Sequence, residues 1–238
     1  MFKTITLKPT KEKSILRRHP WVFSGAIKAI ENGISNGDIV EIKSNKGRFL
    51  GYGHYNEGSI AIRIFEFNQL TIDNAYWEGK IKKAISQRHH NLEINGKNNI
   101  YRLVHAEGDE MPGCIIDRYD NVIVMQFHSV GMWKLKEIFS KTIAKQLPEI
   151  DVIYDKSENT LPEVLKQEFQ IQNSYLLRKI DASDVIASEY GNQFKINWVT
   201  GQKTGFFIDQ RENRKLLGEY SQNTVSYTHL TLPTTTLV

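Results

Sequence analysis

The pattern of hydrophobic and polar positions divides the chain into a strand-rich beginning and a mixed helix–strand remainder. Residues 3–8 alternate as a strand does, and a short helix is expected over 12–18, before a proline at position 20. Further strands are expected where β-branched and aromatic runs lie between Gly, Asn and Ser turns, at 38–43, 48–55 and 59–67. This spacing predicts a small β-barrel-like domain over residues 1–70.

Residues 71–180 read as an α+β middle domain. Trp77, Ile81, Ala84 and Ile85 recur at helical spacing and predict a helix over 73–92. A second helix is expected over 132–147. Strands are expected between turns, at 101–106, 114–118, 122–128 and 151–155. Residues 157–180 show no clear pattern.

A third region, 181–225, begins with a predicted hairpin, 185–190 and 193–199, that leads into the stretch 199–214. Asp209 followed by Glu212 is the pattern of a capping box and predicts a helix over 209–220 that buries Leu216, Leu217 and Tyr220. Its positive end would favour an anionic group beside Lys203, Arg211 and Arg214. The alternative is an ordinary strand–turn–helix connection in which Phe206 and Phe207 belong to the core.

Composition places the chain among soluble globular proteins, because 40% of its residues are hydrophobic and 24% are charged. The sequence has no apolar run long enough to cross a bilayer and no hydrophobic leader, so we expect a cytoplasmic protein without a membrane partner. Cys114 is the single cysteine, which excludes an internal disulfide. Its place before two isoleucines indicates a core residue more than a nucleophile.

Positive charge gathers at the beginning of the chain. Residues 1–50 hold ten lysines and arginines against four acids, although the whole chain is only +4. This excess predicts a surface for a polyanion. Arg17, Arg18 and His19 are candidates for phosphate contacts, whereas Trp21 and Phe23 are expected in the core, with base stacking by Trp21 as the alternative.

Two groups of residues that resemble reactive sites are interpreted as structural. His89 and His90 are adjacent and lack the spacing of helical metal ligands, so no metal is expected. Five acids flank predicted strands and are expected to be solvated turn residues: Glu107, Asp109, Glu110, Asp117 and Asp120.

Three stretches resemble one family in the order in which the family carries them. Residues 12–27 resemble the start of a PUA domain, an RNA-binding module. Residues 110–119 resemble a hallmark of the family's middle domain, which links the RNA module to the catalytic domain. The run from Gly201 to Arg214 is similar to the stretch ahead of the first cofactor-binding strand in class I S-adenosylmethionine-dependent methyltransferases of the large-subunit ribosomal RNA cytosine-5 type.

The resemblance implies a multidomain α+β protein: a PUA-like barrel, the middle domain and the start of a Rossmann-like α/β methyltransferase domain. It implies S-adenosylmethionine as cofactor and ribosomal RNA as partner. The implied cofactor contacts are Gln202, Lys203, Thr204, Gly205, Phe206, Phe207, Asp209, Arg211 and Arg214. The implied RNA contacts are Lys13, Arg17, Arg18, His19 and Trp21.

The resemblance stops near residue 225. Residues 226–238 are threonine-rich, contain no glycine and resemble translated adapter sequence, so we expect a non-native tail that adds no stability. The family's glycine-rich turn and its nucleophilic cysteine, which attacks C6 of the target cytosine, are therefore expected to be missing. On this interpretation the chain alone is inactive and binds cofactor weakly or not at all. The rival interpretation is a non-catalytic RNA-binding protein; a phosphate site at 201–214 would lack the P-loop pattern.

Overall fold

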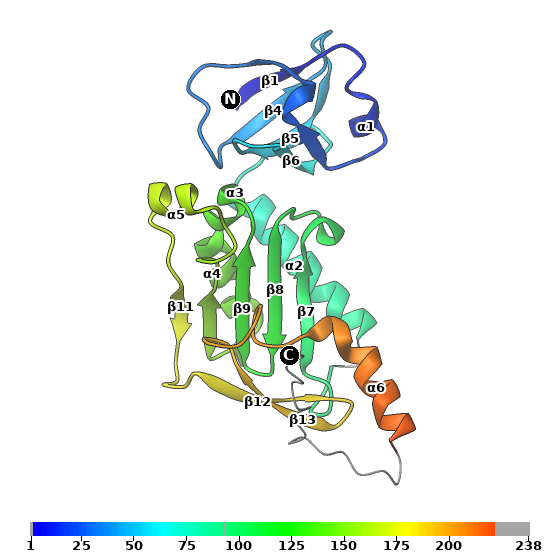
Figure 1. The fold of residues 1–238 in the computed structure, drawn as a ribbon, viewed down its shortest axis with the longest axis vertical. Coiled ribbons are helices and arrows are strands. Elements are labelled where there is room, and N and C mark those ends of the chain that lie inside the picture. The colour runs from blue at the N-terminus through cyan, green and yellow to red at the C-terminus, as the bar shows by residue number, and fades with distance from the viewer. Residues whose placement is uncertain (1, 93, 222–238) are drawn as a thin grey trace, which may run out of the picture. The chain divides into compact units, whose positions relative to one another are not determined.

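The computed structural model describes residues 2–92 and 94–221, and its chain divides into two compact units, 1–206 and 207–238. The first unit begins with a six-stranded sheet (Figure 1). Its strands, in the order in which they pair, are β2 (Trp21–Phe23), β6 (Ile60–Glu66), β5 (Phe49–Tyr55), β4 (Ile39–Lys43), β1 (Lys3–Leu7) and β3 (Ile27–Ile30). The expected β-rich domain is therefore present.

A single apolar cluster holds these strands together. Ile5, Val40 and Ile62 are completely buried in it, one from each of three strands. Ile5 and Val40 each lie between partly exposed neighbours, which is the period-two pattern of a half-buried strand. In β1 and β4 the hydrophobic alternation thus sets which face turns inward, whereas β6 is buried along most of its length.

Some local expectations for this domain were wrong. The helix α1 covers only Lys13–Leu16, because Arg18 adopts a left-handed φ of 62° that ends helical geometry. Strand β3 escaped the sequence analysis, since its residues are mostly exposed and show no alternation. Phe23 is not in the core: about half of its surface (51%) is exposed, and Val22 is the buried residue of β2.

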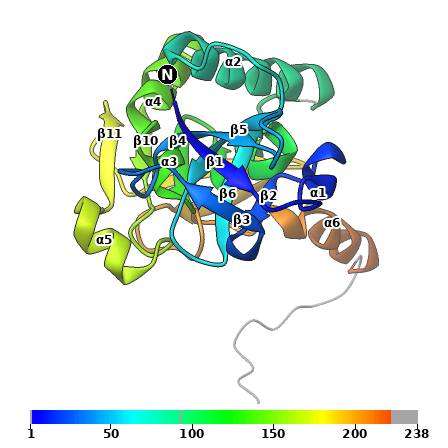
Figure 2. The same ribbon diagram turned by 90° about the horizontal axis from the view of Figure 1, so that it is seen from above.

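The next part of the first unit is a five-stranded sheet with two long helices on one face (Figures 1 and 2). The helices are α2 (Asn74–Asn91) and α4 (Lys136–Gln146), which pack against each other. The strands, in pairing order, are β11 (Ser174–Arg178), β10 (Val152–Asp155), β9 (Val122–Phe127), β8 (Cys114–Tyr119) and β7 (Ile100–His105). Only β9 and β10 pair in parallel among them.

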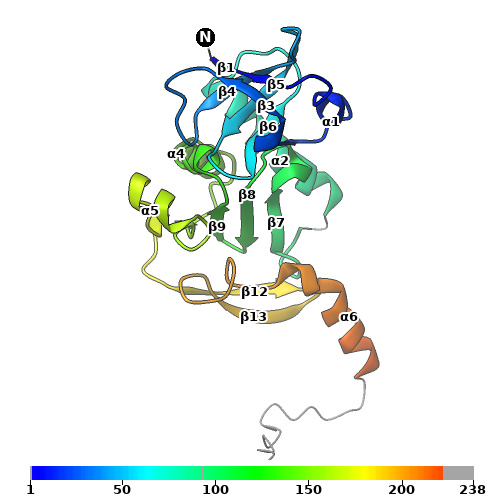
Figure 3. The same ribbon diagram turned by 45° about the horizontal axis from the view of Figure 1, so that its top comes forward.

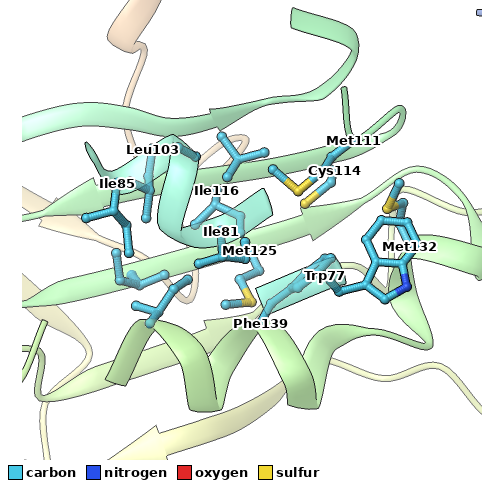
Figure 4. Packing of buried hydrophobic residues seen from close by; sticks show 14 of the residues in the cluster. Trp77, Ile81, Ile85, Leu103, Met111, Cys114, Ile116, Met125, Met132 and Phe139 are labelled. Carbon is cyan, nitrogen blue, oxygen red and sulfur yellow. The ribbon is translucent and has the colours of Figure 1, made fainter. Parts of the chain in front are cut away.

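The helices bury their apolar faces on this sheet (Figure 4). Trp77, Ile81 and Ile85 lie on the face of α2 that the helical period predicts. Asp73 caps the helix, because its carboxylate accepts a hydrogen bond from the Tyr76 amide at 2.9 Å. Phe139 of α4 packs edge-on against Trp77, with ring centroids 6.1 Å apart. Cys114 is also in this cluster, and burial raises the pKa of its thiol well above the usual range.

The predicted helix over 132–147 is two helices. A short helix α3 (Val130–Trp133) begins where the Ser129 hydroxyl accepts a hydrogen bond from the Met132 amide, and α4 starts three residues after it ends. The stretch without a sequence pattern contains α5 (Glu163–Phe169) and β11. Strand β11 has only half-buried or exposed residues, so its sequence carries no alternation to detect.

One histidine lies where the barrel strands meet the middle helices. His54 of β5 is 3% exposed and its ring stacks against Trp77 of α2, with centroids 5.8 Å apart. Gly131 of α3 lies directly against this ring, since a Cβ at that position would be 2.2 Å from the His54 Cγ. Burial, then the charges of Lys134 and Arg63, lower the pKa of His54 to about 3.

A two-stranded hairpin, β12 (Asp184–Glu189) and β13 (Asn192–Asn197), follows in the first unit (Figure 3). The hairpin was predicted, and each strand begins one residue earlier than expected. Asn99, at the start of β7, accepts a hydrogen bond from the Ser188 amide through its side chain at 2.6 Å and donates one to the Ser188 carbonyl at 3.0 Å. These bonds fix the hairpin to the edge of the five-stranded sheet.

The second unit, in its described part, is a 3₁₀ turn (Ile208–Gln210) followed by α6 (Arg211–Tyr220). The predicted capping box is wrong: Gln210 is the N-cap, with no side-chain capping bond among the described residues, and the helix begins two residues later than expected. Leu216, Leu217 and Tyr220 are exposed within this unit rather than buried. The predicted tail, 226–238, lies outside the described residues.

Candidate functional site

The turn that follows β13 has a fixed backbone conformation. The Gly201 amide donates to the Asn197 carbonyl at 3.1 Å, and the Gly205 amide donates to the Gln202 carbonyl at 2.8 Å. Lys203 has a left-handed φ of 51° and Gly205 a φ of 131°. Gly201 lies too close to the chain for any side chain, because a Cβ there would be 2.3 Å from the Asn197 carbonyl oxygen.

A buried hydrogen-bond chain connects this turn to strand β8. The Thr204 hydroxyl donates to the Asp117 carboxylate at 2.6 Å and lies 2.6 Å from the Tyr119 hydroxyl. A hydroxyl has one proton to donate, so the Tyr119 hydroxyl is the donor of the second bond. Burial, then the negative charge of Asp117, raise the pKa of Tyr119 above its usual range.

Asp117 is the last group of this hydrogen-bond chain, and it also pairs with Arg102. Its carboxylate is completely buried and accepts two bonds from the Arg102 guanidinium, at 2.8 and 3.1 Å. A buried carboxylate needs such compensation, because desolvation alone disfavours its charged form. The sequence expectation that Asp117 is a solvated turn residue was therefore wrong.

Asp109 also departs from that expectation. Its carboxylate pairs with Arg88 through two bonds of 2.6 Å and accepts the His105 amide at 2.5 Å. Only 6% of its side chain is exposed. Glu110, by contrast, is largely exposed and pairs with Lys80. The sequence places both acids in one turn, and it carries no signal that Arg88, twenty-one residues away, covers one of them.

Two backbone carbonyls of the turn are also held. The Gln126 side-chain amide donates to the Lys203 carbonyl at 3.2 Å, and the Lys156 ammonium donates to the Gly201 carbonyl. Burial lowers the pKa of Lys156. Neither Gln126 nor Lys156 was predicted from the sequence, since one is an ordinary polar residue inside a predicted strand and the other directly follows one.

The predicted cofactor residues of the first unit differ in the solvent exposure of their side chains. Gln202 and Lys203 have exposed side chains, whereas Thr204 is 1% exposed and points to Asp117. Phe206 is half-buried and packs on Phe194 of β13, with ring centroids 4.9 Å apart. Gly205 completes the turn. An exposed ammonium and an exposed amide suit the carboxylate and hydroxyl groups of S-adenosylmethionine, so the donor set of this turn fits that cofactor.

The predicted cofactor residues of the second unit lie around the start of α6. Phe207 and Asp209 are exposed, and Arg211 and Arg214 are half-buried within the unit. The Arg214 guanidinium donates to the Phe207 carbonyl at 2.8 Å. This bond ties the first turn of α6 to the residue before the 3₁₀ turn.

The predicted RNA-binding residues lie together around α1 and β2. Lys13, Arg17, Arg18 and His19 are exposed, and Trp21 is half-buried. The Arg18 guanidinium lies over the Phe67 ring, 5.4 Å from its centroid, which orients the charge without removing it.

Trp21 is held in place from two sides. Its indole Nε1 donates to the Glu107 carboxylate at 2.9 Å, and its amide donates to His19 Nδ1 at 3.2 Å. A groove of about 330 Å³ lies beside it, lined in part by Lys11, Ser14 and Phe23. The exposed ring of Phe23 is the aromatic surface here that the sequence analysis assigned to the core.

Within residues 2–92 and 94–221, no three His, Cys, Asp or Glu side chains gather as a metal site would require. Across the same described part of the chain, no helix is both long and apolar enough to cross a bilayer.

Residues 5–67 match the family described as "PUA-like domain", so the N-terminal domain is PUA-like. A curated relative named Ribosomal RNA large subunit methyltransferase I, from Pseudoalteromonas atlantica, is 37% identical over 94% of this chain and 56% of its own length. A relative of the same name from Shewanella amazonensis is 35% identical over 91% and 54%. The chain spans about half the length of the curated relatives it matches.

Two solved structures share the fold. A candidate SAM-dependent methyltransferase from Streptococcus mutans superposes with a TM-score of 0.73 at 17% identity, over 91% of this chain and 54% of that one. A second structure, of a candidate methyltransferase complexed with SAH, gives a TM-score of 0.74 at 17% identity, over 91% and 53%. These likenesses establish a mixed α/β architecture of the kind found in these two proteins.

Proposed function

We propose that this chain carries the RNA-recruiting and cofactor-approach parts of an S-adenosylmethionine-dependent methyltransferase that modifies C5 of a cytosine in large-subunit ribosomal RNA. The observation that carries the proposal is the 37% identity, over 94% of the chain, to a relative named as a methyltransferase of that RNA. The choice of C5 rests on the resemblance of the 201–214 stretch. We propose a cytoplasmic location for the same activity, because its proposed substrate is ribosomal RNA.

In this proposal the turn 201–206 approaches the cofactor, which supplies an activated methyl group on its sulfonium. Lys203 gives a positive charge for the cofactor's carboxylate, and Gln202 gives an amide for its polar groups. Phe207, Asp209, Arg211 and Arg214 are further proposed contacts, on the strength of the family resemblance. Cys114 has no part in catalysis, since it is buried in the core as a neutral thiol.

The RNA contacts are proposed for the exposed basic group around α1. Lys13, Arg17, Arg18 and His19 supply charge, and the groove beside Trp21 and Phe23 offers an aromatic surface for an unpaired base. Phosphate contacts of this kind give affinity and position, while base contacts give selectivity.

The cofactor part is tested by ligand-observed NMR with S-adenosylhomocysteine, which detects weak complexes. The chain should bind it, and Lys203→Ala should weaken binding about tenfold, as loss of one charge-assisted bond predicts. Lys195→Ala removes an exposed lysine of β13 and serves as the matched control. Equal binding by the Lys203→Ala variant and the unchanged chain would remove the turn from the cofactor site.

The activity is tested by deleting the encoding gene in its host and digesting the large-subunit RNA for mass spectrometry. We expect one 5-methylcytidine to disappear and to return on complementation. RNA binding by the chain, with no methylcytidine lost and no binding of S-adenosylhomocysteine, would instead favour a non-catalytic RNA-binding protein.

A further inference from the structure

Thr204 is unusual among the predicted cofactor residues, because its side chain points away from solvent. It is 1% exposed and its hydroxyl lies between Tyr119 and Asp117 of strand β8. The single hydroxyl proton is donated to Asp117, so the buried side chain has no donor left for a ligand. Its contribution to the turn is therefore structural.

The bonds of Thr204 join it to charged and aromatic groups that are themselves fixed. Asp117 is completely buried and also holds two bonds from Arg102. Tyr119 is completely buried in the sheet. Because neither partner can move without leaving a buried polar group unpaired, the position of the Thr204 hydroxyl is set by strand β8.

The backbone around Thr204 needs such an anchor. Lys203, on one side, has a left-handed φ of 51°, which is uncommon for a residue with a side chain. Gly205, on the other side, has a φ of 131°. Conformations of this kind persist only where the surrounding structure imposes them. Here the surroundings include the Thr204 hydroxyl bonds, the bond from Gln126 to the Lys203 carbonyl and the bond from Lys156 to the Gly201 carbonyl.

We propose that Asp117 and Tyr119 are positioning residues: through Thr204 they fix the conformation of the turn 201–206, and so they set where Gln202 and Lys203 meet the cofactor. The cofactor part of this inference rests on the proposed function. The anchoring of the turn by β8 does not depend on it.

The first test measures hydrogen exchange of the amides of residues 201–206. Thr204→Val keeps the shape of the side chain and removes the hydroxyl, and Tyr119→Phe removes the phenol that donates to it. Because the Phe206 backbone also bonds to that phenol, the Phe206 amide is left out of the Tyr119→Phe comparison. Each should speed exchange in the turn about tenfold, the effect of losing one net hydrogen bond from a locally opening segment. Thr204→Ser should restore the slow exchange, since it keeps the hydroxyl. Thr200→Val, at an exposed position of the same loop, is the control and should leave exchange unchanged.

The exchange of amides in β8 and β9, measured in the same samples, shows whether a variant has loosened the whole sheet. Unchanged exchange at 201–206 in both Thr204→Val and Tyr119→Phe would overturn the proposal. So would equally fast exchange in Thr204→Ser and Thr204→Val, because the hydroxyl would then have no special role.

The second test measures S-adenosylhomocysteine affinity in the same variants by NMR titration. Weaker binding in Thr204→Val and Lys203→Ala supports both the positioning role and the proposed function. Weaker binding in Lys203→Ala alone overturns the link between anchoring and cofactor position but keeps the cofactor turn. Unchanged binding in Lys203→Ala contradicts the proposed function, while the exchange measurement still decides whether β8 positions the turn.

Discussion

At the scale of single residues, the environment of a side chain was harder to predict than its place in an element. Asp109 and Asp117 occur at predicted turns and strand ends, yet both are buried and paired with arginines. Their partners, Arg88 and Arg102, lie on other elements, and only the folded sheet brings them together. Cys114 was predicted correctly because its apolar neighbours in the strand define its environment.

His54 leads to a prediction about pH. Its pKa is about 3 in the folded protein and near 6.5 when unfolded, so between these values the unfolded chain binds more protons. The stability that neutral His54 contributes is therefore fully present above about pH 6.5, and it is lost as the pH is lowered towards 3. The His54 contribution to this slope is about 1.4 kcal/mol per pH unit between pH 6 and 4.

Urea denaturation at several pH values measures this slope. His54→Phe should lose the His54 contribution, whereas the same substitution at His89, which is exposed on α2, should retain it. His128, whose pKa is also lowered by burial, contributes equally in all three proteins and cancels in the comparison. Parallel pH profiles for the unchanged chain and His54→Phe would contradict the buried neutral imidazole.

Gly131 gives a second prediction at this scale. An alanine there would place its Cβ 2.2 Å from the His54 ring, which stacks on Trp77 and has no room to retreat. We expect Gly131→Ala to lower the free energy of unfolding by about 2–3 kcal/mol through overpacking. Gly79→Ala, on α2 with open space around its Cα, should stabilise the protein slightly, by up to about 1 kcal/mol. Equal effects of the two substitutions would show that His54 moves freely.

At the scale of elements, the strength of the sequence pattern decided what could be predicted. Helix α2 has an apolar face at helical spacing and a capping Asp73, and its predicted bounds differ from the observed ones by one residue at each end. Strands β3 and β11 have no buried alternating face, and both were missed. The start of α6 was predicted two residues too early, because Asp209 lies in a 3₁₀ turn that precedes the helix. The sequence pattern of Asp209 and Glu212 does not distinguish such a turn from the first turn of a helix.

The contact between α2 and the turn after β7 offers an element-scale prediction. Asp109→Ala leaves the Arg88 guanidinium half-buried without its carboxylate, and should destabilise the protein by about 3 kcal/mol. Glu110→Ala, at the next residue, removes a carboxylate that is 55% exposed and pairs with Lys80 and Lys83, so it should cost less, about 1 kcal/mol. Chemical denaturation of the two variants makes the comparison.

A double variant distinguishes the cost of the unpaired Arg88 charge from the loss of the other hydrogen bond to Asp109. Combining Asp109→Ala with Arg88→Met removes both charges and should recover part of the lost stability, because no unpaired guanidinium then remains buried. No recovery in the double variant would mean that the bond from the His105 amide to Asp109, at 2.5 Å, is the important one.

At the scale of the whole molecule, the first unit combines two surfaces with different chemistry. The PUA-like domain carries the excess of positive charge, whereas the five-stranded sheet holds the turn 201–206 through buried polar groups. The order of these parts followed from the sequence, since each part has its own hydrophobic pattern. The anchoring of the turn did not, because Thr204 and Asp117 are 87 residues apart.

The last prediction concerns the affinity of the chain for ribosomal RNA as salt is varied. Each phosphate contact that a protein makes releases counterions, so the slope of log affinity against log salt counts those contacts. Arg17 and Arg18 are both exposed beside α1, in the part of the chain with an excess of six positive charges. Replacing both by alanine should therefore make the slope shallower by about one to two units. Lys141→Ala with Lys145→Ala removes the same charge from the exposed side of α4 and should leave the slope nearly unchanged. If the α4 variant changed the slope and the α1 variant did not, the RNA surface would lie on the middle helices instead of the barrel.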